Sequence, residues 1–245
     1  MWRSMFRVAA ATALFGAVHS ALASRPAKRA AARLCGQRNR NGLYRVFFIG
    51  QSLVSFTLLA LYIRRQPGRE LYRLRGPAVW VIRAGQGASL LYATAAASQV
   101  GIPRILGLQS LLAWRGDGPV PAEPEAQGPA LDAEGLSRPA GPFARSRHPL
   151  NFAPLPIFWL SPRMTTNLLA FNVVSTLYLI VGSLHEEARL REAYPEIYVT
   201  YQASGTPFYV PAIRRSRCHI APESRLAAES GRRGTRRVPA GGRHL

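Results

Sequence analysis

Acidic residues are scarce in this chain: its 245 residues include 12 Asp and Glu against 32 Lys and Arg, a formal net charge of +20 at pH 7. Such an excess of cations is one signature of nucleic-acid binding, because Lys and Arg supply non-specific affinity for phosphates. Here, however, the basic residues cluster beside apolar runs, over 25–45, over 64–75 and after residue 211. Flanking charge of this kind anchors and orients membrane helices. The composition therefore indicates membrane lipid, and no nucleic acid, as a partner.

Metal-ligating residues are also few. The two cysteines, Cys35 and Cys218, lie in basic segments that we expect in the cytosol, where disulfides are rare, and we assign neither a role. Five histidines are far fewer than a membrane di-iron oxygenase built from histidine clusters requires. His185 beside Glu186 suits iron or zinc in ligand type, but the histidine count argues against it. We therefore predict no metal centre.

What the chain does contain is long apolar runs. Residues 46–63 and 164–184 carry no charged residue, and residues 78–98 carry one, Arg83. A helix of about 20 such residues crosses a hydrocarbon core of about 30 Å. Together with residues 6–24, these runs predict an all-α integral membrane protein with four to five transmembrane helices. Gln, Asn, Ser and Thr within the runs should face neighbouring helices.

The run at 6–24 has two interpretations. Arg3 and Arg7 precede it and the sequence ALA at 21–23 follows it, a pattern typical of a secretory signal peptide with its cleavage site. The next residues, RPAKRAAAR at 25–33, form a dense positive cluster that favours retention on the cytoplasmic side. We therefore favour an uncleaved transmembrane helix over a signal peptide.

A short apolar stretch, LNFAPLPIFWL at 150–160, precedes the last apolar run. It is broken by Pro154 and Pro156 and is too short to cross a bilayer alone, but it can form a re-entrant hairpin with its successor. Such a hairpin returns the chain to the face that it left. The hairpin's entrance at RH (147–148) and its exit at HEE (185–187) should therefore lie close together.

The remaining segments divide the chain. Residues 116–141 are rich in proline and glycine, which predicts a flexible connector. Apolar and aromatic residues at three- and four-residue spacing over 186–202 predict an amphipathic surface helix, interrupted at Pro195. The Arg-rich residues 212–245 predict a basic, disordered tail. We assign residues 1–211 to one membrane domain.

Several motifs follow one another in the second half of the chain: GPFARSRHPL at 141–150, the hairpin, the pair Glu186-Glu187, and Tyr198-x-x-Tyr201 before a final proline. This set resembles the C-terminal cofactor region of the isoprenylcysteine carboxyl methyltransferase and phospholipid methyltransferase superfamily. The N-terminal stretch HSALASRPAKRAAARLCGQRNRNGLYRVFF is similar to NnrU-type membrane proteins and to bacterial methanethiol S-methyltransferases. RHPLNFAPLPIFWLSPRMT resembles the hairpin of the latter group.

The resemblance implies methyl transfer from S-adenosylmethionine, bound at the cytosolic face, to a thiol or carboxylate, with a small thiol such as methanethiol favoured over prenylcysteine. It implies a protein of the bacterial inner membrane with a cytoplasmic C-terminus. An in-line displacement mainly needs positioning, so no metal and no covalent enzyme intermediate is required. The cofactor-binding residues that the resemblance assigns are Arg147, His148, Pro149, Leu150, Asn151, Glu186, Glu187, Tyr198 and Tyr201.

The assigned residue types have suitable chemistry. Arg and His pair with a carboxylate such as that of the cofactor, and Glu accepts hydrogen bonds from its hydroxyl and ammonium donors. The sequence departs from the family at Asn151 and Ala153, where members commonly carry tyrosine and glycine. The alternative function is therefore that of a non-catalytic NnrU-like membrane protein, which assists nitrogen-oxide respiration or another membrane complex.

Overall fold

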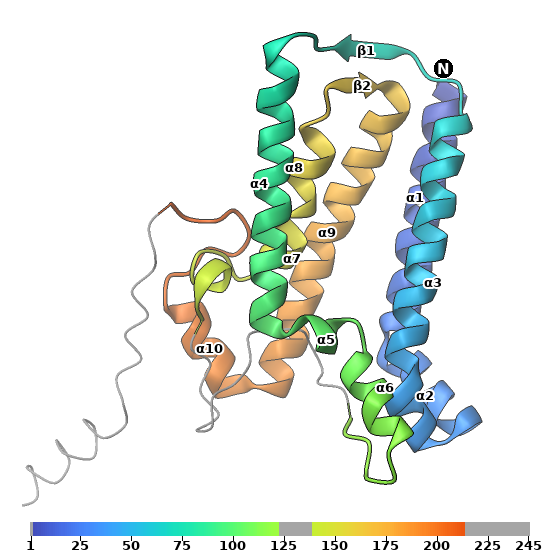
Figure 1. The fold of residues 1–245 in the computed structure, drawn as a ribbon, viewed down its shortest axis with the longest axis vertical. Coiled ribbons are helices and arrows are strands. Elements are labelled where there is room, and N and C mark those ends of the chain that lie inside the picture. Colours follow the sequence, from blue (N-terminus) through green and yellow to red (C-terminus); the bar gives the residue numbers. More distant parts are fainter. Residues whose placement is uncertain (1, 123–138, 214–245) are drawn as a thin grey trace, which may run out of the picture.

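The computed structural model describes residues 2–122 and 139–213 of the chain, and its fold is a bundle of helices with a small β-sheet at one end (Figure 1). The long helices are α1 (Trp2–Ala23), α3 (Gln37–Arg65), α4 (Pro77–Val100) and α9 (Thr166–Ala193). The shorter helices are α2 (Arg25–Cys35), α5 (Ile102–Ile105), α6 (Leu108–Arg115), α7 (Pro149–Phe152), α8 (Pro154–Trp159) and α10 (Pro195–Ala203). The strands are β1 (Glu70–Arg73) and β2 (Arg163–Thr165), and η1 (Gly141–Ala144) is a 3-10 turn.

Proline marks where several helices begin. Pro77, Pro149, Pro154 and Pro195 occupy the first turns of α4, α7, α8 and α10. Proline suits this position because the first turn needs no backbone N–H donor and the ring presets φ. The same residue type cannot continue a preceding helix, so α9 ends before Pro195, where the sequence predicted an interruption.

Three helices are long and apolar enough to cross a membrane. They are α1, α3 and α9, with 22, 29 and 28 residues and a mean hydropathy of 1.4, 2.0 and 1.7 in the most apolar window of each. Their outward faces carry exposed large apolar side chains such as Leu53 and Leu177, which suit contact with lipid. The fold is therefore that of an all-helical membrane protein, as the sequence predicted.

The fourth predicted span, α4, has 24 residues but does not reach the same mean hydropathy. Its Arg83 donates a hydrogen bond to Gln86 Oε1 over 2.9 Å, and Gln86 Nε2 donates to the carbonyl of Ile157 in α8 over 2.9 Å. Polar groups of α4 thus find partners on α4 itself and on α8. Its crossing of the membrane stays a prediction.

A two-stranded antiparallel sheet, which the sequence did not predict, caps one end of the bundle. The β1–β2 register sets Tyr72 opposite Met164 and Arg73 opposite Arg163, with an irregularity between Glu70 and Tyr72. All four residues of β1 are exposed, so no alternation of apolar residues marks the strand. Glu70 accepts hydrogen bonds from Arg73 over 2.6 Å and Arg163 over 2.7 Å, and the hydrogen bond from Arg73 is the main cause that lowers the pKa of Glu70.

The predicted hairpin is present, with two short helices in place of one kinked arm. The helices α7 and α8 lead to β2, from which α9 runs back along the bundle (Figure 1). Asn172 Nδ2 in α9 donates to the carbonyl of Phe158 in α8 over 3.0 Å, which ties the two arms together. Thr165 caps α9, because its hydroxyl accepts a hydrogen bond from the N–H of Leu168 over 3.2 Å.

The first helix packs along α9 and contributes polar contacts inside the bundle. Ser4 Oγ donates to Asn167 Oδ1 over 3.0 Å, and Ser20 Oγ and the Tyr178 hydroxyl are hydrogen-bonded over 3.0 Å. Ser20 and Asn167 of the apolar runs thus face neighbouring helices, as predicted. Thr57 and Thr94 do not, because they are exposed and their hydroxyls donate to carbonyls of their own helices. The run at 6–24 is a packed helix of the described fold. The apolar core next to these contacts consists of Val8, Leu59, Ala170 and Phe171.

Two predicted segments lie largely outside the described residues. The connector is described only at 116–122 and 139–141, and the basic tail only at residues 212 and 213. The predicted surface helix over 186–202 is divided, because its first part continues α9 and its second part is α10. The domain boundary at residue 211 stays a prediction.

Cysteine labelling should place β1 on one side of the membrane and both α6 and α10 on the other. The long helices α1 and α3 separate the two ends (Figure 1). Leu71, Leu112 and Val199 are exposed and suit single-cysteine substitution after Cys35 and Cys218 are replaced by serine. Labelling of Leu71→Cys and Leu112→Cys from the same face would contradict this arrangement. Labelling of Leu112→Cys and Val199→Cys from opposite faces would contradict the hairpin.

Candidate active site

Arg147 fastens the hairpin entrance to the end of α9 and to the segment after α10. Its Nε donates to Glu187 Oε1 over 2.7 Å, and its terminal nitrogen donates to the carbonyl of Thr206 over 2.7 Å. Its backbone N–H donates to the carbonyl of Pro207 over 2.9 Å, and its guanidinium lies 5.8 Å from the centre of the Phe208 ring. Charge-assisted hydrogen bonds of this kind are among the stronger ones in proteins. These contacts confirm that the entrance and exit of the hairpin lie together.

His148 lies between the two adjacent glutamates of α9. Its Nε2 is 3.3 Å from Glu187 Oε1, and its Nδ1 is 3.4 Å from Glu186 Oε2. The residue is 4% exposed, and its ring meets the Phe208 ring edge-on with the centres 5.1 Å apart. Its backbone N–H donates to Ser146 Oγ over 3.2 Å. A buried imidazole with a carboxylate at each nitrogen restrains both glutamate side chains.

Glu187 is the centre of a buried hydrogen-bond network. The residue is 3% exposed. Besides its contacts with Arg147 and His148, it accepts hydrogen bonds from Gln202 Nε2 over 2.8 Å and from Arg191 over 3.2 Å. Because buried charges are tolerated when they are paired and hydrogen-bonded, this carboxylate holds the hairpin entrance, α9 and α10 in one arrangement.

Glu186 lies at the edge of this network, where it contacts the other nitrogen of His148 over 3.4 Å. Adjacent residues of a helix differ in direction by about 100°, so the two glutamates serve different surroundings. Glu186 Oε2 accepts a hydrogen bond from Asn151 Nδ2 over 3.3 Å, and the same amide donates to Ser183 Oγ over 2.9 Å. The Glu186 side chain is 26% exposed and lines a cavity. Glu186 is therefore the carboxylate that can reach a ligand.

The tyrosines near the C-terminal end of the described chain support the hairpin entrance. The hydroxyls of Tyr201 and Tyr209 donate to backbone carbonyls there, to Phe143 over 2.6 Å and to Asn151 over 2.7 Å. Burial raises the pKa of Tyr209 to about 12. Burial, and next the charge of the neighbouring α9 carboxylate, also raise the pKa of Tyr198. The hydroxyls of Tyr198 and Tyr209 therefore stay protonated near neutral pH.

A cavity of about 600 Å³ lies beside Glu186. Residues of α1, α2, α3, α9 and the segment 104–122 line it, and Asn151 reaches it from α7. Small-molecule sites typically have volumes of about 300–1,000 Å³. The lining therefore encloses enough space for a small-molecule cofactor, and it includes the cations Lys28, Arg45, Arg104 and Arg189.

Two of the predicted cofactor-binding residues, Asn151 and Glu186, line this cavity. They are held in place by the network around the hairpin entrance. The direct contact of the other predicted residues with a cofactor stays a prediction. Those that do not line the cavity in the described fold are Arg147, His148, Pro149, Leu150, Glu187, Tyr198 and Tyr201.

Sequence reasoning missed the part of the cavity that comes from the first half of the chain. His19 lines the cavity and its Nδ1 is hydrogen-bonded to Ser52 Oγ over 3.0 Å. An ionisable residue inside an apolar run is costly in lipid and by default marks a functional position. His19 could therefore have been predicted as a site residue from the sequence. Arg45 also lines the cavity, but at the border of an apolar run it has the same pattern as an interfacial anchor.

No metal centre is apparent in the part of the chain that the structure describes. Among residues 2–122 and 139–213, no three His, Cys, Asp or Glu side chains gather closely enough to hold a metal ion. His185 and Glu186, which the sequence analysis considered as metal ligands, both line the cavity. Cys35 is exposed.

The chain is similar to curated methyltransferases over part of its length. It is 34% identical to a methanethiol S-methyltransferase of Pseudomonas deceptionensis over 92 residues. These residues make up 38% of this chain and 35% of that protein. Over 94 residues it is 34% identical to a methanethiol S-methyltransferase of a Pseudomonas species, strain GM41, covering 38% of this chain and 31% of that protein. The chain thus spans about a third of the length of these relatives. No family model and no solved structure matches the chain.

Proposed function

We propose that this chain is an S-adenosylmethionine-dependent methyltransferase of the membrane, and that its acceptor is a small thiol. The observation that carries the proposal is the Glu186–Asn151 pair on the wall of a cavity that also contains four cations. The partial similarity to two methanethiol S-methyltransferases supports the reaction class. Lipophilic thiols and carboxylates are the other acceptors that an assay must include.

The residues of the cavity suit this cofactor. Cations such as Lys28 and Arg104 would pair with its methionyl carboxylate, and Glu186 would accept hydrogen bonds from its ammonium or ribose hydroxyl groups. Aromatic rings such as Phe48 and Tyr178 offer π-faces to a positively charged group. When bound, the cofactor supplies a methyl group on a cationic sulfur, which a nucleophile attacks in line.

The residues of the chain act by positioning and by excluding water. His148 and Asn151 hold the Glu186 carboxylate from two sides, at 3.4 Å and 3.3 Å, so this carboxylate is oriented before a ligand binds. The apolar side chains of Ile49 and Leu179 line the same cavity and limit water near the reacting atoms. Such prior orientation reduces the entropy that must be lost when the reactants meet.

We propose that the protein lies in a bacterial inner membrane, with its exposed apolar faces against membrane lipid. The end of the bundle with α2, α6 and α10 then lies in the cytoplasm. The larger of the two internal basic clusters supports this orientation, since seven Lys and Arg lie at 25–45 against five at 64–75. The cysteine labelling described above tests this orientation.

Methyl transfer by the purified protein tests the proposed function. Detergent-solubilised protein is incubated with methyl-labelled S-adenosylmethionine and methanethiol, and labelled dimethyl sulfide is measured in the headspace. We expect transfer by the wild type and its loss in Glu186→Ala, while Glu196→Ala, which removes an exposed carboxylate of α10, keeps it. A folded wild type that methylates neither thiols nor carboxylates would contradict the proposal and favour the NnrU-like alternative.

Asn151→Tyr, which restores the residue that is common in the family, should weaken cofactor binding in this chain. The substitution removes the amide that donates to Glu186 and Ser183 and places a larger ring at the cavity wall. Losing one such hydrogen bond typically costs about 1 kcal/mol. Calorimetric titration with S-adenosylhomocysteine measures the effect, with Asn151→Asp as a variant of similar size. Tighter binding by Asn151→Tyr would contradict a specialised role of Asn151.

A further inference from the structure

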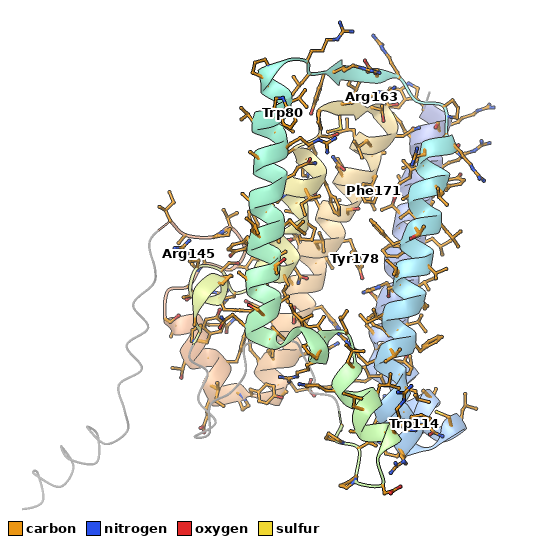
Figure 2. All side chains as sticks on the ribbon, viewed as in Figure 1. Trp80, Trp114, Arg145, Arg163, Phe171 and Tyr178 are labelled. Carbon is orange, nitrogen blue, oxygen red and sulfur yellow. The ribbon has the colours of Figure 1, made fainter. Side chains whose placement is uncertain are left out.

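Three rings from three helices close the inner end of the cavity. His19 comes from α1, Phe48 from α3 and Tyr178 from α9, and we call these three side chains the ring layer. The His19 and Phe48 ring centres are 4.7 Å apart, and the Tyr178 ring meets His19 edge-on at 6.4 Å. Figure 2 shows Tyr178 between α9 and the pair α1–α3. On α9 the lining begins at Tyr178 and ends at Arg189, so the ring layer is the level nearest the middle of the bundle.

Hydrogen bonds and a close backbone contact hold the ring layer in place. His19 Nδ1 is hydrogen-bonded to Ser52 Oγ over 3.0 Å, and the Tyr178 hydroxyl to Ser20 Oγ over 3.0 Å. The Tyr178 ring lies directly against Gly16, where an added Cβ would be 2.8 Å from Cδ2 of the ring. The ring therefore has no room to retreat toward α1.

The cavity changes in polarity along its length. The end away from the ring layer includes the cations Lys28 and Arg104. Ile49 and Leu179 line the cavity next to the rings, where the Arg45 guanidinium also lies, 5.8 Å from the centre of the Phe48 ring. A cofactor with a carboxylate and several polar groups would occupy the part with the cations and Glu186. The apolar part beside the ring layer then remains for the acceptor. This assignment rests on the proposed function.

We propose that Tyr178 is a specificity-determining residue, which restricts the acceptor to thiols with a short alkyl group. In the transfer, the thiol gives its proton to water and its sulfur forms a bond to the methyl carbon. The bond from that carbon to the cofactor sulfur breaks, and its electron pair stays on that sulfur, so the products are a neutral thioether and S-adenosylhomocysteine. A short alkyl group fits beside Tyr178, but a longer one meets a ring that cannot retreat toward α1, because the ring already lies against Gly16.

A series of alkanethiols tests this proposal on the full chain. Methanethiol, ethanethiol, butanethiol and hexanethiol are offered as acceptors, and the corresponding methyl alkyl sulfides are titrated in the presence of S-adenosylhomocysteine. The titration measures binding without turnover. In the wild type, kcat/KM and sulfide affinity should both fall by about tenfold or more from the methyl to the hexyl member. Tyr178→Ala should abolish this fall, and the matched control Leu177→Ala, on the exposed face of α9, should keep it.

Tyr178→Leu provides a second variant, because it removes the ring but keeps apolar volume at this position. A folded Tyr178 variant that binds S-adenosylhomocysteine but retains the wild-type length limit would overturn the proposal. Equal transfer to all four thiols by the wild type would also overturn it, while leaving the proposed function intact. A wild type that neither binds S-adenosylhomocysteine nor methylates any thiol would instead contradict the proposed function on which this inference rests.

Discussion

Substituting Glu187 by glutamine should lower the free energy of unfolding by about 3–5 kcal/mol, the usual cost of removing one partner from a buried ion pair. The Glu187 side chain is 4% exposed and that of its partner Arg147 is 15% exposed. Glutamine preserves the shape but removes the charge, so Arg147 stays buried without a compensating anion. Thermal or denaturant unfolding of the purified protein in detergent measures the loss.

The matched control for this prediction is Glu192→Gln in the same helix. Glu192 accepts a hydrogen bond from Arg25 over 3.0 Å, but its side chain is 65% exposed. Exposed ion pairs contribute about 0–1 kcal/mol, because solvent screens them. Equal destabilisation by Glu187→Gln and Glu192→Gln would show that the buried network does not hold the hairpin as described.

Replacing Glu186 by alanine should weaken S-adenosylhomocysteine binding by about 1.5–3 kcal/mol, which is typical of losing a hydrogen bond to a charged group. The loss of stability should be smaller than for Glu187, because Glu186 lies at the cavity wall, is 26% exposed and touches the buried network only through His148. Calorimetric titration, with unfolding measured in parallel, separates the two glutamates. Wild-type affinity in Glu186→Ala would show that this carboxylate does not contact the ligand.

The substitution His148→Ala extends the same test, because the His148 ring contacts both glutamates. Its Nε2 lies 3.3 Å from Glu187 Oε1 and its Nδ1 lies 3.4 Å from Glu186 Oε2. The substitution should lower stability and weaken binding together. The double variant His148→Ala, Glu186→Ala should weaken binding by less than the sum of the single effects, since both substitutions disturb one ligand pose. Strict additivity in binding would indicate that His148 acts independently of Glu186.

The hairpin and the meeting of its two ends could be predicted from the sequence, because run length and proline position constrain how a membrane segment folds. A stretch too short to span must return or stay within the protein, and this places Arg147 near Glu187. The split between the glutamates also follows from helix geometry. Which of them faces the cavity could not be predicted, because the rotation of α9 depends on its packing against α1 and α10.

The cavity itself could not be predicted, because α1, α3 and α9 build it from residues far apart in the sequence. Its inner end depends on the fit of Gly16 against Tyr178, a contact that no local pattern indicates. The β1–β2 sheet was missed for a different reason. Its strands are short and β1 is wholly exposed, so they lack the alternation that reveals longer strands.

Asn151 and Ala153, the two departures from the pattern of the family that the sequence resembles, have different structural meanings. Ala153 is fully buried, and its carbonyl accepts a hydrogen bond from Ser89 Oγ of α4 over 2.7 Å. It is therefore a packing position between α4 and the hairpin. Asn151 lines the cavity and bonds to Glu186, so the consequences of this departure fall on the proposed cofactor site.

Calorimetric titration of the purified wild-type chain with S-adenosylhomocysteine tests the central claim most directly, because it reports cofactor binding without knowledge of the acceptor. The cavity beside Glu186 predicts saturable binding with one site per chain, which Glu186→Ala weakens and Glu196→Ala leaves unchanged. No saturable heat from a protein that unfolds cooperatively would contradict the claim that the hairpin entrance and α9 form a cofactor site.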